Sequence, residues 1–122
     1  MPTILVIDDD HIVREAIRDI LDIIDVNVID ASNGADGAEL FSENFEQIDG
    51  IILDRRMPRM DGIETMKVLR QINPSTPIIM SSGFAENKAT ANLNDVSPDA
   101  YLYKPYEIQD LINMIQTIVL KE

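Results

Sequence analysis

The sequence predicts an α/β fold, a doubly wound parallel sheet of five strands with helices on both faces. Five short aliphatic runs alternate along the chain with longer stretches of helical periodicity. The runs are apolar without a break, which is typical of strands covered on both faces and therefore of a parallel sheet. Five strand–helix units are too few for a closed barrel, which needs about eight.

The first half of the chain contains two strand–helix units. Residues 3–8 are a predicted strand of consecutive aliphatic side chains that ends in acids. A helix is predicted from Asp10, because apolar residues then recur at spacings of three and four; they are Val13, Ala16, Ile17, Ile20, Leu21 and Ile24. Residues 26–30 are the second predicted strand and 35–43 the second helix, with Ala38 and either Phe41 or Leu40 on its inner face.

The third unit and the fourth strand follow the same pattern. Residues 50–54 are a predicted strand that again ends in an acid, and a helix is predicted over 62–72. Its inward positions are Ile63, Met66 and Leu69, and Asn73-Pro74 ends it. Residues 77–81 are the fourth predicted strand.

The last part of the chain contains one segment with a weak helical pattern and one with a strong helical pattern. Residues 85–93 predict only a weak helix, because the apolar positions are mostly alanine and the segment contains asparagine and threonine. Residues 100–103 are the fifth predicted strand. The final helix, over 107–120, is strongly periodic.

The composition limits the class of function. Acidic residues outnumber basic ones by 22 to 10, and the net charge of −12 repels a phosphate backbone, so no direct nucleic-acid binding is expected. The absence of cysteine excludes disulfides, thiolate metal sites and cysteine catalysis. The apolar runs are too short to cross a bilayer and no signal peptide is expected, which is consistent with a cytoplasmic domain without membrane contact. Residues 1–122 are expected to form a single domain.

Polar side chains gather where the predicted strands end. They are Asp8 and Asp9 after the first strand, Asp54 after the third, Ser82 after the fourth and Lys104 after the fifth. Ligands of open parallel sheets bind beyond the carboxyl ends of the strands. Because neighbouring strands lie about 4.8 Å apart, we expect these side chains to converge around one spot.

Such a cluster favours one kind of chemistry. Crowded carboxylates repel one another unless positive charge is present. Lys104 supplies one positive charge, and an all-oxygen ligand set suits Mg²⁺, with Mn²⁺ as a substitute. A carboxylate that attacks phosphorus beside cations is what phosphoryl transfer requires. The pattern therefore indicates metal-dependent phosphoryl transfer.

The same residues resemble a known family. Its motifs occur in order along the chain, as Ile7-Asp8-Asp9, Asp54-x-x-Met57-Pro58-x-Met60-Asp61-Gly62, Ser82-Gly83 and Tyr101-x-x-Lys104-Pro105. The pattern is similar to the receiver domain of two-component response regulators over essentially the whole chain. The resemblance implies a flavodoxin-like (βα)5 fold with strand order 2-1-3-4-5. It also implies a signalling domain that promotes its own phosphorylation and dephosphorylation and is not a turnover enzyme.

The resemblance implies a role for each matched acid. Asp54 corresponds to the phosphoacceptor. Asp8, Asp9, Asp54 and the backbone carbonyl of Arg56 correspond to the ligands of Mg²⁺.

The other matched positions are implied to bind and sense the phosphoryl group. Ser82, Gly83 and Lys104 correspond to its ligands, and Tyr101 to an aromatic switch residue that turns inward when the hydroxyl of Ser82 is drawn towards phosphate. Phosphorylation then shifts the population of two conformers and reshapes the surface of the fourth helix, fifth strand and fifth helix.

The resemblance also implies partners. The phosphoryl donor is a sensor histidine kinase or a histidine phosphotransfer domain, and homodimer formation on phosphorylation, through the surface just named, is a further option. Residues 81–84 and 104–106 are similar to receivers fused to hybrid histidine kinases, while a stand-alone regulator remains the alternative.

Three other functions fit the sequence less well. Aspartate-nucleophile phosphatases have an Asp-x-Asp motif whose first acid is the nucleophile and whose second acid is the general acid. This chain has Arg56 in place of the second acid. A flavodoxin-like cofactor binder needs a phosphate loop rich in Ser, Thr and Gly after the first strand, where this chain has three aspartates and His11. A degenerate receiver that only docks a partner would not need the complete set of acids, hydroxyl and lysine.

Several neighbouring residues have structural interpretations. Asp10 is expected to favour the helix dipole, with a fourth acid of the site as the alternative, and His11 is expected to be an exposed residue at the helix start. Ser81 is expected to point away from the site by strand alternation. Arg55 and Arg56 depart from the family pattern; we expect solvated surface cations, with the alternative that Arg56 shields the phosphoryl group from water.

Two further groups of apolar residues lie near these motifs. Ile12 and Ile23 lie off the apolar stripe of the first helix, and are either surface residues or part of a docking surface for a histidine-bearing helix bundle. Four methionines are interpreted as loop and core packing; they are Met57, Met60, Met66 and Met80.

Overall fold

The computed structural model describes residues 1–83 and 97–121 and has the predicted α/β architecture. Five parallel strands form one sheet in the order β2-β1-β3-β4-β5. The strands are β1 (Thr3–Ile7), β2 (Asn27–Ala31), β3 (Gly50–Asp54), β4 (Ile78–Gly83) and β5 (Ala100–Lys104). The doubly wound sheet and its strand order are therefore confirmed.

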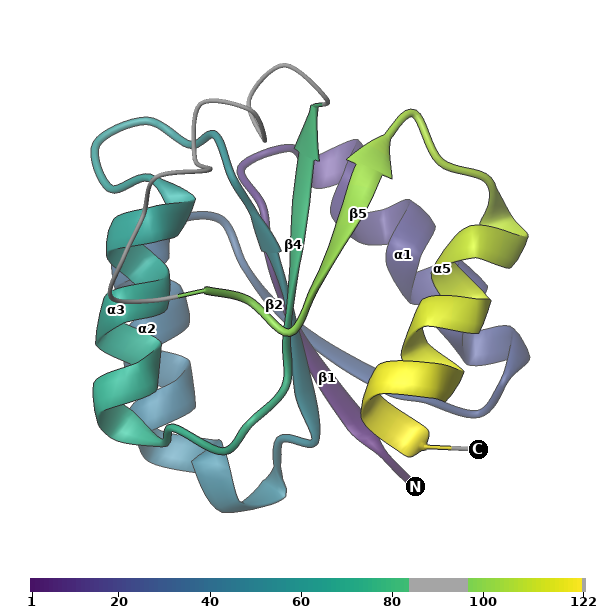
Figure 1. Cartoon of the computed structure of the whole chain (residues 1–122), viewed down its shortest axis with the longest axis horizontal. Coiled ribbons are helices and arrows are strands. Elements are labelled where there is room, and N and C mark those ends of the chain that lie inside the picture. The colour runs from purple at the N-terminus through teal and green to yellow at the C-terminus, as the bar shows by residue number, and fades with distance from the viewer. Residues whose placement is uncertain (84–96, 122) are drawn as a thin grey trace.

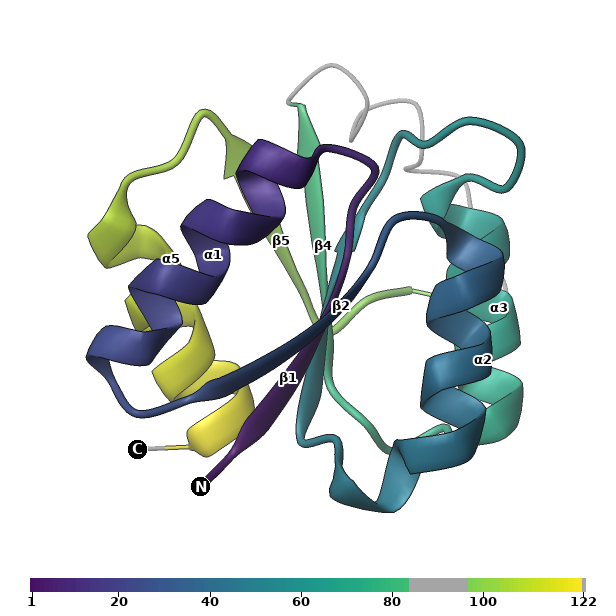
Figure 2. The same ribbon diagram turned by 180° about the vertical axis from the view of Figure 1, so that it is seen from behind.

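Helices cover both faces of this sheet (Figure 1). The helices on one face are α1 (His11–Ile23) and α5 (Ile108–Met114), and those on the other are α2 (Gly34–Asn44) and α3 (Gly62–Ile72). Seen from behind, the same two helical layers flank the twisted strands (Figure 2). No helix in residues 1–83 or 97–121 combines the length and apolar character needed to cross a membrane.

The element bounds differ from the predicted ones at a few ends. β4 continues through Gly83, because its pairing with β5 extends to the pair of Gly83 and Lys104. The final helix changes to π-helical geometry over Ile115–Leu120. A short 3₁₀ turn, Phe45–Gln47, was not predicted. The helix expected over 85–93 lies outside the described residues.

The core has two layers, one on each face of the sheet. On β1, Leu5 and Ile7 belong to the cluster under α2 and α3, whereas Ile4 and Val6 belong to the cluster under α1 and α5. Successive residues of β1 thus meet opposite helix layers, which explains why this central strand is apolar without alternation. In α2, Phe41 is fully buried and is the inner residue, while Leu40 only packs against the core from its edge.

The loops after β1 and β3 end in helix caps. Asp10 accepts hydrogen bonds from the amides of Ile12 and Val13 at 2.9 and 3.4 Å, so it is the N-cap of α1 rather than a residue of its first turn. Asp61 accepts one from the amide of Glu64 at 2.9 Å and begins α3 in the same way. Because a capped helix start has a defined position, both caps restrain the loops that carry the acidic residues.

The surface residues of α1 remain exposed. Ile12 and Ile23 are 77% and 70% accessible to solvent, so they are surface residues in this structure, and their docking role stays a prediction. The methionines behave as expected where they are buried, since Met57, Met66 and Met80 all belong to the core under α2 and α3.

Ser81 is an exception in the core, because its hydroxyl is buried without a hydrogen-bond partner among the described residues. A buried unpaired polar group costs about 1–3 kcal/mol. We therefore expect Ser81→Ala to raise the free energy of unfolding by about 1 kcal/mol in urea denaturation. Thr65→Val is the matched control. It removes a buried hydroxyl that donates to the Asp61 carbonyl at 2.8 Å, so it should lower stability instead. Loss of stability in both variants would contradict the prediction.

Candidate functional site

The carboxyl ends of β1 and β3 bring three acids together. The two strands are neighbours with Ile7 opposite Leu53, so the next residues, Asp8 and Asp54, lie at the same level of the sheet edge. Asp8 and Asp54 are 3% and 4% accessible, while Asp9 is exposed. One carboxylate oxygen from each of the three lies within 4.8 Å of the other two.

The loop after β1 holds Asp8 in a fixed orientation. Its amide donates to the carbonyl of Ala31 on β2 at 3.1 Å, and its Oδ1 accepts the amide of Asp10 at 2.8 Å. Its carbonyl accepts a hydrogen bond from the guanidinium of Arg14 at 2.7 Å. Both the backbone and the side chain of Asp8 are therefore restrained.

Lys104 reaches the acids from β5. Its Nζ lies 3.0 Å from Oδ1 of Asp54. The registers explain the approach, because Asp54 lies opposite Ser81 on β4 and Lys104 lies opposite Gly83, two residues further along that strand. The lysine thus spans β4 to contact the acid of β3.

These side chains surround one cleft of about 340 Å³. It is lined by Asp8, Asp9, Asp10, Val13, Asp54, Arg56, Gly83 and Lys104. Six positions predicted from the sequence, namely Asp8, Asp9, Asp54, Arg56, Gly83 and Lys104, therefore meet in space.

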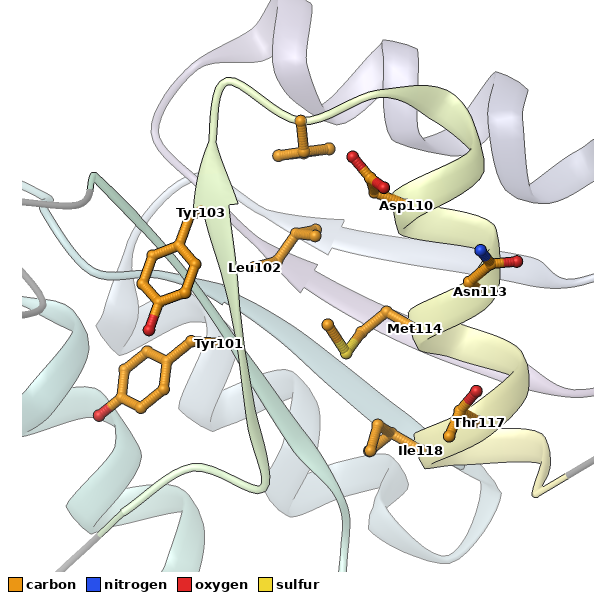
Figure 3. Close-up of a pocket in the computed structure, with 9 residues that line it drawn as sticks. Tyr101, Leu102, Tyr103, Asp110, Asn113, Met114, Thr117 and Ile118 are labelled. Atoms are coloured by element: carbon orange, nitrogen blue, oxygen red, sulfur yellow. The ribbon is translucent and has the colours of Figure 1, made fainter.

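Ser82 and Tyr101 are placed differently. Ser82 is buried on β4, and its hydroxyl donates to the carbonyl of Gly83 at 3.0 Å. Tyr101 lines a separate cavity of about 510 Å³ beside β5 and α5. Figure 3 shows Tyr101 and Tyr103 on the side of β5 that faces away from α5; their rings are stacked with centroids 6.0 Å apart.

The two arginines after Asp54 have different environments. Arg56 is exposed at the cleft. Arg55 is only 21% accessible, and its Nη1 lies 3.8 Å from Oδ2 of Asp61. The expectation of a solvated cation is thus wrong for Arg55, whose Nε is buried and whose Nη1 lies beside Asp61 at the start of α3.

The electrostatics of the cleft favour a bound cation. Burial raises the pKa of Asp8 to about 6, and the charges of Asp54 and Asp9 add to the effect. Burial also raises the pKa of Asp54, although Lys104 opposes this. Burial lowers the pKa of Lys104, but the hydrogen bond that its ammonium donates to Asp54 and the charges of the nearby carboxylates outweigh burial, so the net shift is upward. A bound cation would favour the ionised form of these carboxylates. Because their ligand atoms are all oxygens, the cleft fits a hard divalent cation such as Mg²⁺.

Asp8→Asn is expected to stabilise the cation-free protein at neutral pH. The pKa of Asp8 is about 6 in the folded protein against an ordinary 3.8, so the folded state binds the proton of this carboxyl more tightly than the unfolded state. The stabilisation of the fold that results is complete below about pH 3.8 and is lost as the pH rises through 6. That difference corresponds to about 3 kcal/mol. An asparagine keeps an oxygen acceptor for the Asp10 amide. Urea denaturation with EDTA should show the variant more stable than wild type above about pH 7, with the difference fading towards pH 4. A less stable variant at pH 7 would contradict this origin of the pKa shift.

One contact of the site was missed by the sequence analysis. Arg14 touches the Asp8 carbonyl and forms an ion pair with Asp30 of β2 at 2.9 Å. The available signal was an arginine one helical turn after the Asp10 cap together with an acid near the end of the second strand.

Comparison with known proteins identifies the family. The family model described as "response regulator receiver domain" matches residues 4–116. The chain belongs to this family. Response regulator MprA from Mycobacterium sp. (strain KMS) is 32% identical over 117 residues, which cover 95% of this chain and 50% of that protein. This receiver domain thus spans about half the length of that relative.

Two further similar proteins are a sensor kinase and a receiver domain of known structure. Autoinducer 1 sensor kinase/phosphatase LuxN from Vibrio campbellii is 30% identical over 114 residues, which cover 93% of this receiver domain and 13% of that protein. The crystal structure of a response regulator receiver domain protein from Clostridium thermocellum superposes with a TM-score of 0.90 at 29% identity, covering 99% of this chain and 96% of that one. Sequences similar to this domain therefore occur both in a sensor kinase and in a response regulator.

Proposed function

We propose that this chain is the phosphoacceptor of a two-component phosphorelay, in which a phosphohistidine donor transfers its phosphoryl group to Asp54. Residues 1–122 form one receiver domain in this proposal. The supporting observation is the position of Asp54, which is buried beside Asp8 and Asp9 and accepts a hydrogen bond from Lys104 at 3.0 Å. A nucleophilic carboxylate with a cation in contact is the arrangement that phosphoryl transfer uses.

The transfer itself is a displacement at phosphorus. A carboxylate oxygen of Asp54 forms a bond to phosphorus, the bond from phosphorus to the donor imidazole nitrogen breaks, and that nitrogen keeps the electron pair. The ammonium of Lys104 stabilises charge on the transferred group. The hydroxyl of Ser82 and the amide of Gly83 are the further donors, and the Ser82 hydroxyl must leave the Gly83 carbonyl to act.

Mg²⁺, or Mn²⁺ in its place, is the cofactor that fits the cleft. Asp8, Asp9 and Asp54 would hold it together with the backbone carbonyl of Arg56, which also lines the cleft. When bound, the ion supplies two positive charges against the phosphoryl oxygens.

The response to phosphorylation is a conformational switch at Ser82 and Tyr101. Movement of Ser82 towards the phosphoryl group draws the end of β4 with it, and Tyr101 on the adjacent β5 turns inward. The surface formed by residues 85–93, β5 and α5 changes as a result, and it is also the proposed homodimer contact. Residues 85–93 of that surface lie outside the described part of the chain.

The partners follow from the transfer chemistry. The donor is a sensor histidine kinase or a histidine phosphotransfer domain, located in the cytoplasm with this domain. The similarity to MprA supports a separate response regulator, and the similarity to LuxN supports a receiver within a kinase chain. In either case the domain acts in signalling and not as a turnover enzyme, and it binds neither nucleic acid nor membrane directly.

The test is phosphorylation by a small donor. The protein is incubated with acetyl phosphate and Mg²⁺, and its intact mass is measured. We expect the gain of one phosphoryl group, prevented by EDTA. No gain in mass, or a gain that EDTA leaves unchanged, would contradict the proposed function.

A further inference from the structure

Arg14 connects the acidic loop after β1 to the edge strand β2. Its Nη1 donates to the carbonyl of Asp8 at 2.7 Å, and its Nε donates to Oδ2 of Asp30 at 2.9 Å. The side chain is only 13% accessible. Its two functional contacts therefore form in a partly dry environment, where hydrogen bonds from a charged group are strong.

Both backbone polar groups of Asp8 are consequently tied to β2. The amide is bound directly, to the Ala31 carbonyl at 3.1 Å, and the carbonyl is bound through the guanidinium of Arg14, which Asp30 holds. The plane of the guanidinium fixes the directions of its donors, so one side chain can hold the carbonyl and the Asp30 carboxylate at once. The orientation of the Asp8 peptide follows from these two attachments.

That orientation matters for the three-acid cluster. The carboxylate oxygen of Asp8 must stay within 4.8 Å of those of Asp9 and Asp54 although like charges push them apart. Among the residues that the structure describes, the side chain of Asp8 accepts a hydrogen bond only from the Asp10 amide, which belongs to the same loop. Attachments outside the loop help to resist the repulsion, and Arg14 provides one of them beside the direct bond of the Asp8 amide to Ala31.

We propose that Arg14 is a positioning residue for the cation site, which keeps Asp8 in place for Mg²⁺ by anchoring its carbonyl to Asp30. The inference rests on the proposed function, because it assigns a residue to the cation site of that function. Partners that orient the ligands of a metal typically change its affinity by about 10–100-fold when they are lost.

Arg18 offers a matched control one helical turn further along α1. Its Nη2 pairs with the other oxygen of Asp30 at 3.1 Å, and its Nη1 donates to the Val28 carbonyl at 2.7 Å. Within residues 1–83 and 97–121, its hydrogen bonds all go to β2. Arg18→Met thus removes an arginine pair to the same acid without touching the acidic loop.

The first experiment measures Mg²⁺ binding by calorimetric titration of the whole chain. We expect Arg14→Met to weaken binding by at least about tenfold, and Arg18→Met to change it by less than about twofold. Arg14→Lys keeps the positive charge but lacks the planar guanidinium that binds two acceptors at once, and it should weaken Mg²⁺ binding by about threefold or more. It is the deciding variant if Arg14→Met does not fold. Wild-type affinity in the folded Arg14 variants, or an equal loss in Arg18→Met, would overturn the proposal.

The second experiment needs no cation. Hydrogen exchange of the Asp8 and Asp10 amides, followed by NMR in EDTA, should be about tenfold faster in Arg14→Met than in wild type or Arg18→Met, because the loop opens locally. This separates two kinds of failure. Faster exchange without Mg²⁺ binding by the wild-type protein would contradict the proposed function but leave the anchoring role of Arg14 intact. Unchanged exchange would contradict that anchoring role.

Discussion

Asp54→Asn is expected to abolish phosphorylation by acetyl phosphate. The amide oxygen of asparagine is a poor nucleophile, and no acylphosphate can form from it, while the side chain keeps the size of aspartate. The other acids of the cleft, Asp8 and Asp9, are not expected to replace it, because Lys104 contacts Asp54. Intact mass after incubation with Mg²⁺ and acetyl phosphate gives the result directly.

The same variant should gain stability when no cation is present. The pKa of Asp54 is raised by burial even though Lys104 lowers it, so the surroundings as a whole disfavour the charged carboxylate. A neutral side chain of the same shape removes that cost, and thermal unfolding in EDTA should occur at a higher temperature.

A matched control is Asp25→Asn, which changes the same charge in the turn between α1 and β2, at the opposite end of the sheet from the cleft. Asparagine tolerates the left-handed conformation found there, with φ of 59°. This control should be phosphorylated like wild type. Phosphorylation of Asp54→Asn at the wild-type level would contradict the choice of acceptor.

Much of the fold and the convergence of the site followed from local patterns in the sequence. The bounds of β3 and α3 agree with their predicted ranges, because β3 is a short aliphatic run ending in Asp54 and α3 has the Asp61 cap at its start and Asn73-Pro74 at its end. The meeting of six predicted residues in one cleft followed from the rule that parallel strands present their carboxyl ends at one edge.

The remaining features depend on contacts that no local pattern contains. The role of Arg14 requires knowing that α1 packs beside β2, so that Asp30 comes within reach. The end of β4 depends on its pairing with β5 rather than on the residues of β4 itself. The partial burial of the Arg55 side chain depends on how closely Asp61, at the start of α3, approaches the end of β3, a distance that is set in three dimensions.

That close approach makes Gly62 a decisive residue. A Cβ atom at Gly62 would lie 2.5 Å from the carbonyl oxygen of Asp54 and 2.8 Å from the Cα of Arg55. Both are backbone atoms, so relief requires moving the segment that carries the acceptor and the Arg56 carbonyl. The amide of Gly62 also donates to the Arg55 carbonyl at 3.0 Å, and that hydrogen bond would be strained by the same movement.

Gly62→Ala is therefore expected to lower the free energy of unfolding by about 3 kcal/mol, the upper range for inserting a methyl group into a packed site. Because displacement of reacting groups by an ångström can cost about a hundredfold in rate, phosphorylation of the folded fraction should slow to a similar degree. Urea denaturation and the time course of intact mass measure the two effects.

Gly50→Ala is the control, since it makes the same change at the other end of β3. Its Cβ would meet Cγ2 of Val119 at 2.7 Å, a side-chain atom near the end of the described chain that can move. We expect a loss of about 1 kcal/mol and phosphorylation at the wild-type rate. If Gly50→Ala and Gly62→Ala slowed phosphorylation equally, the loss would come from general destabilisation. The close contact between Gly62 and the backbone of Asp54 would then not be what positions the acceptor.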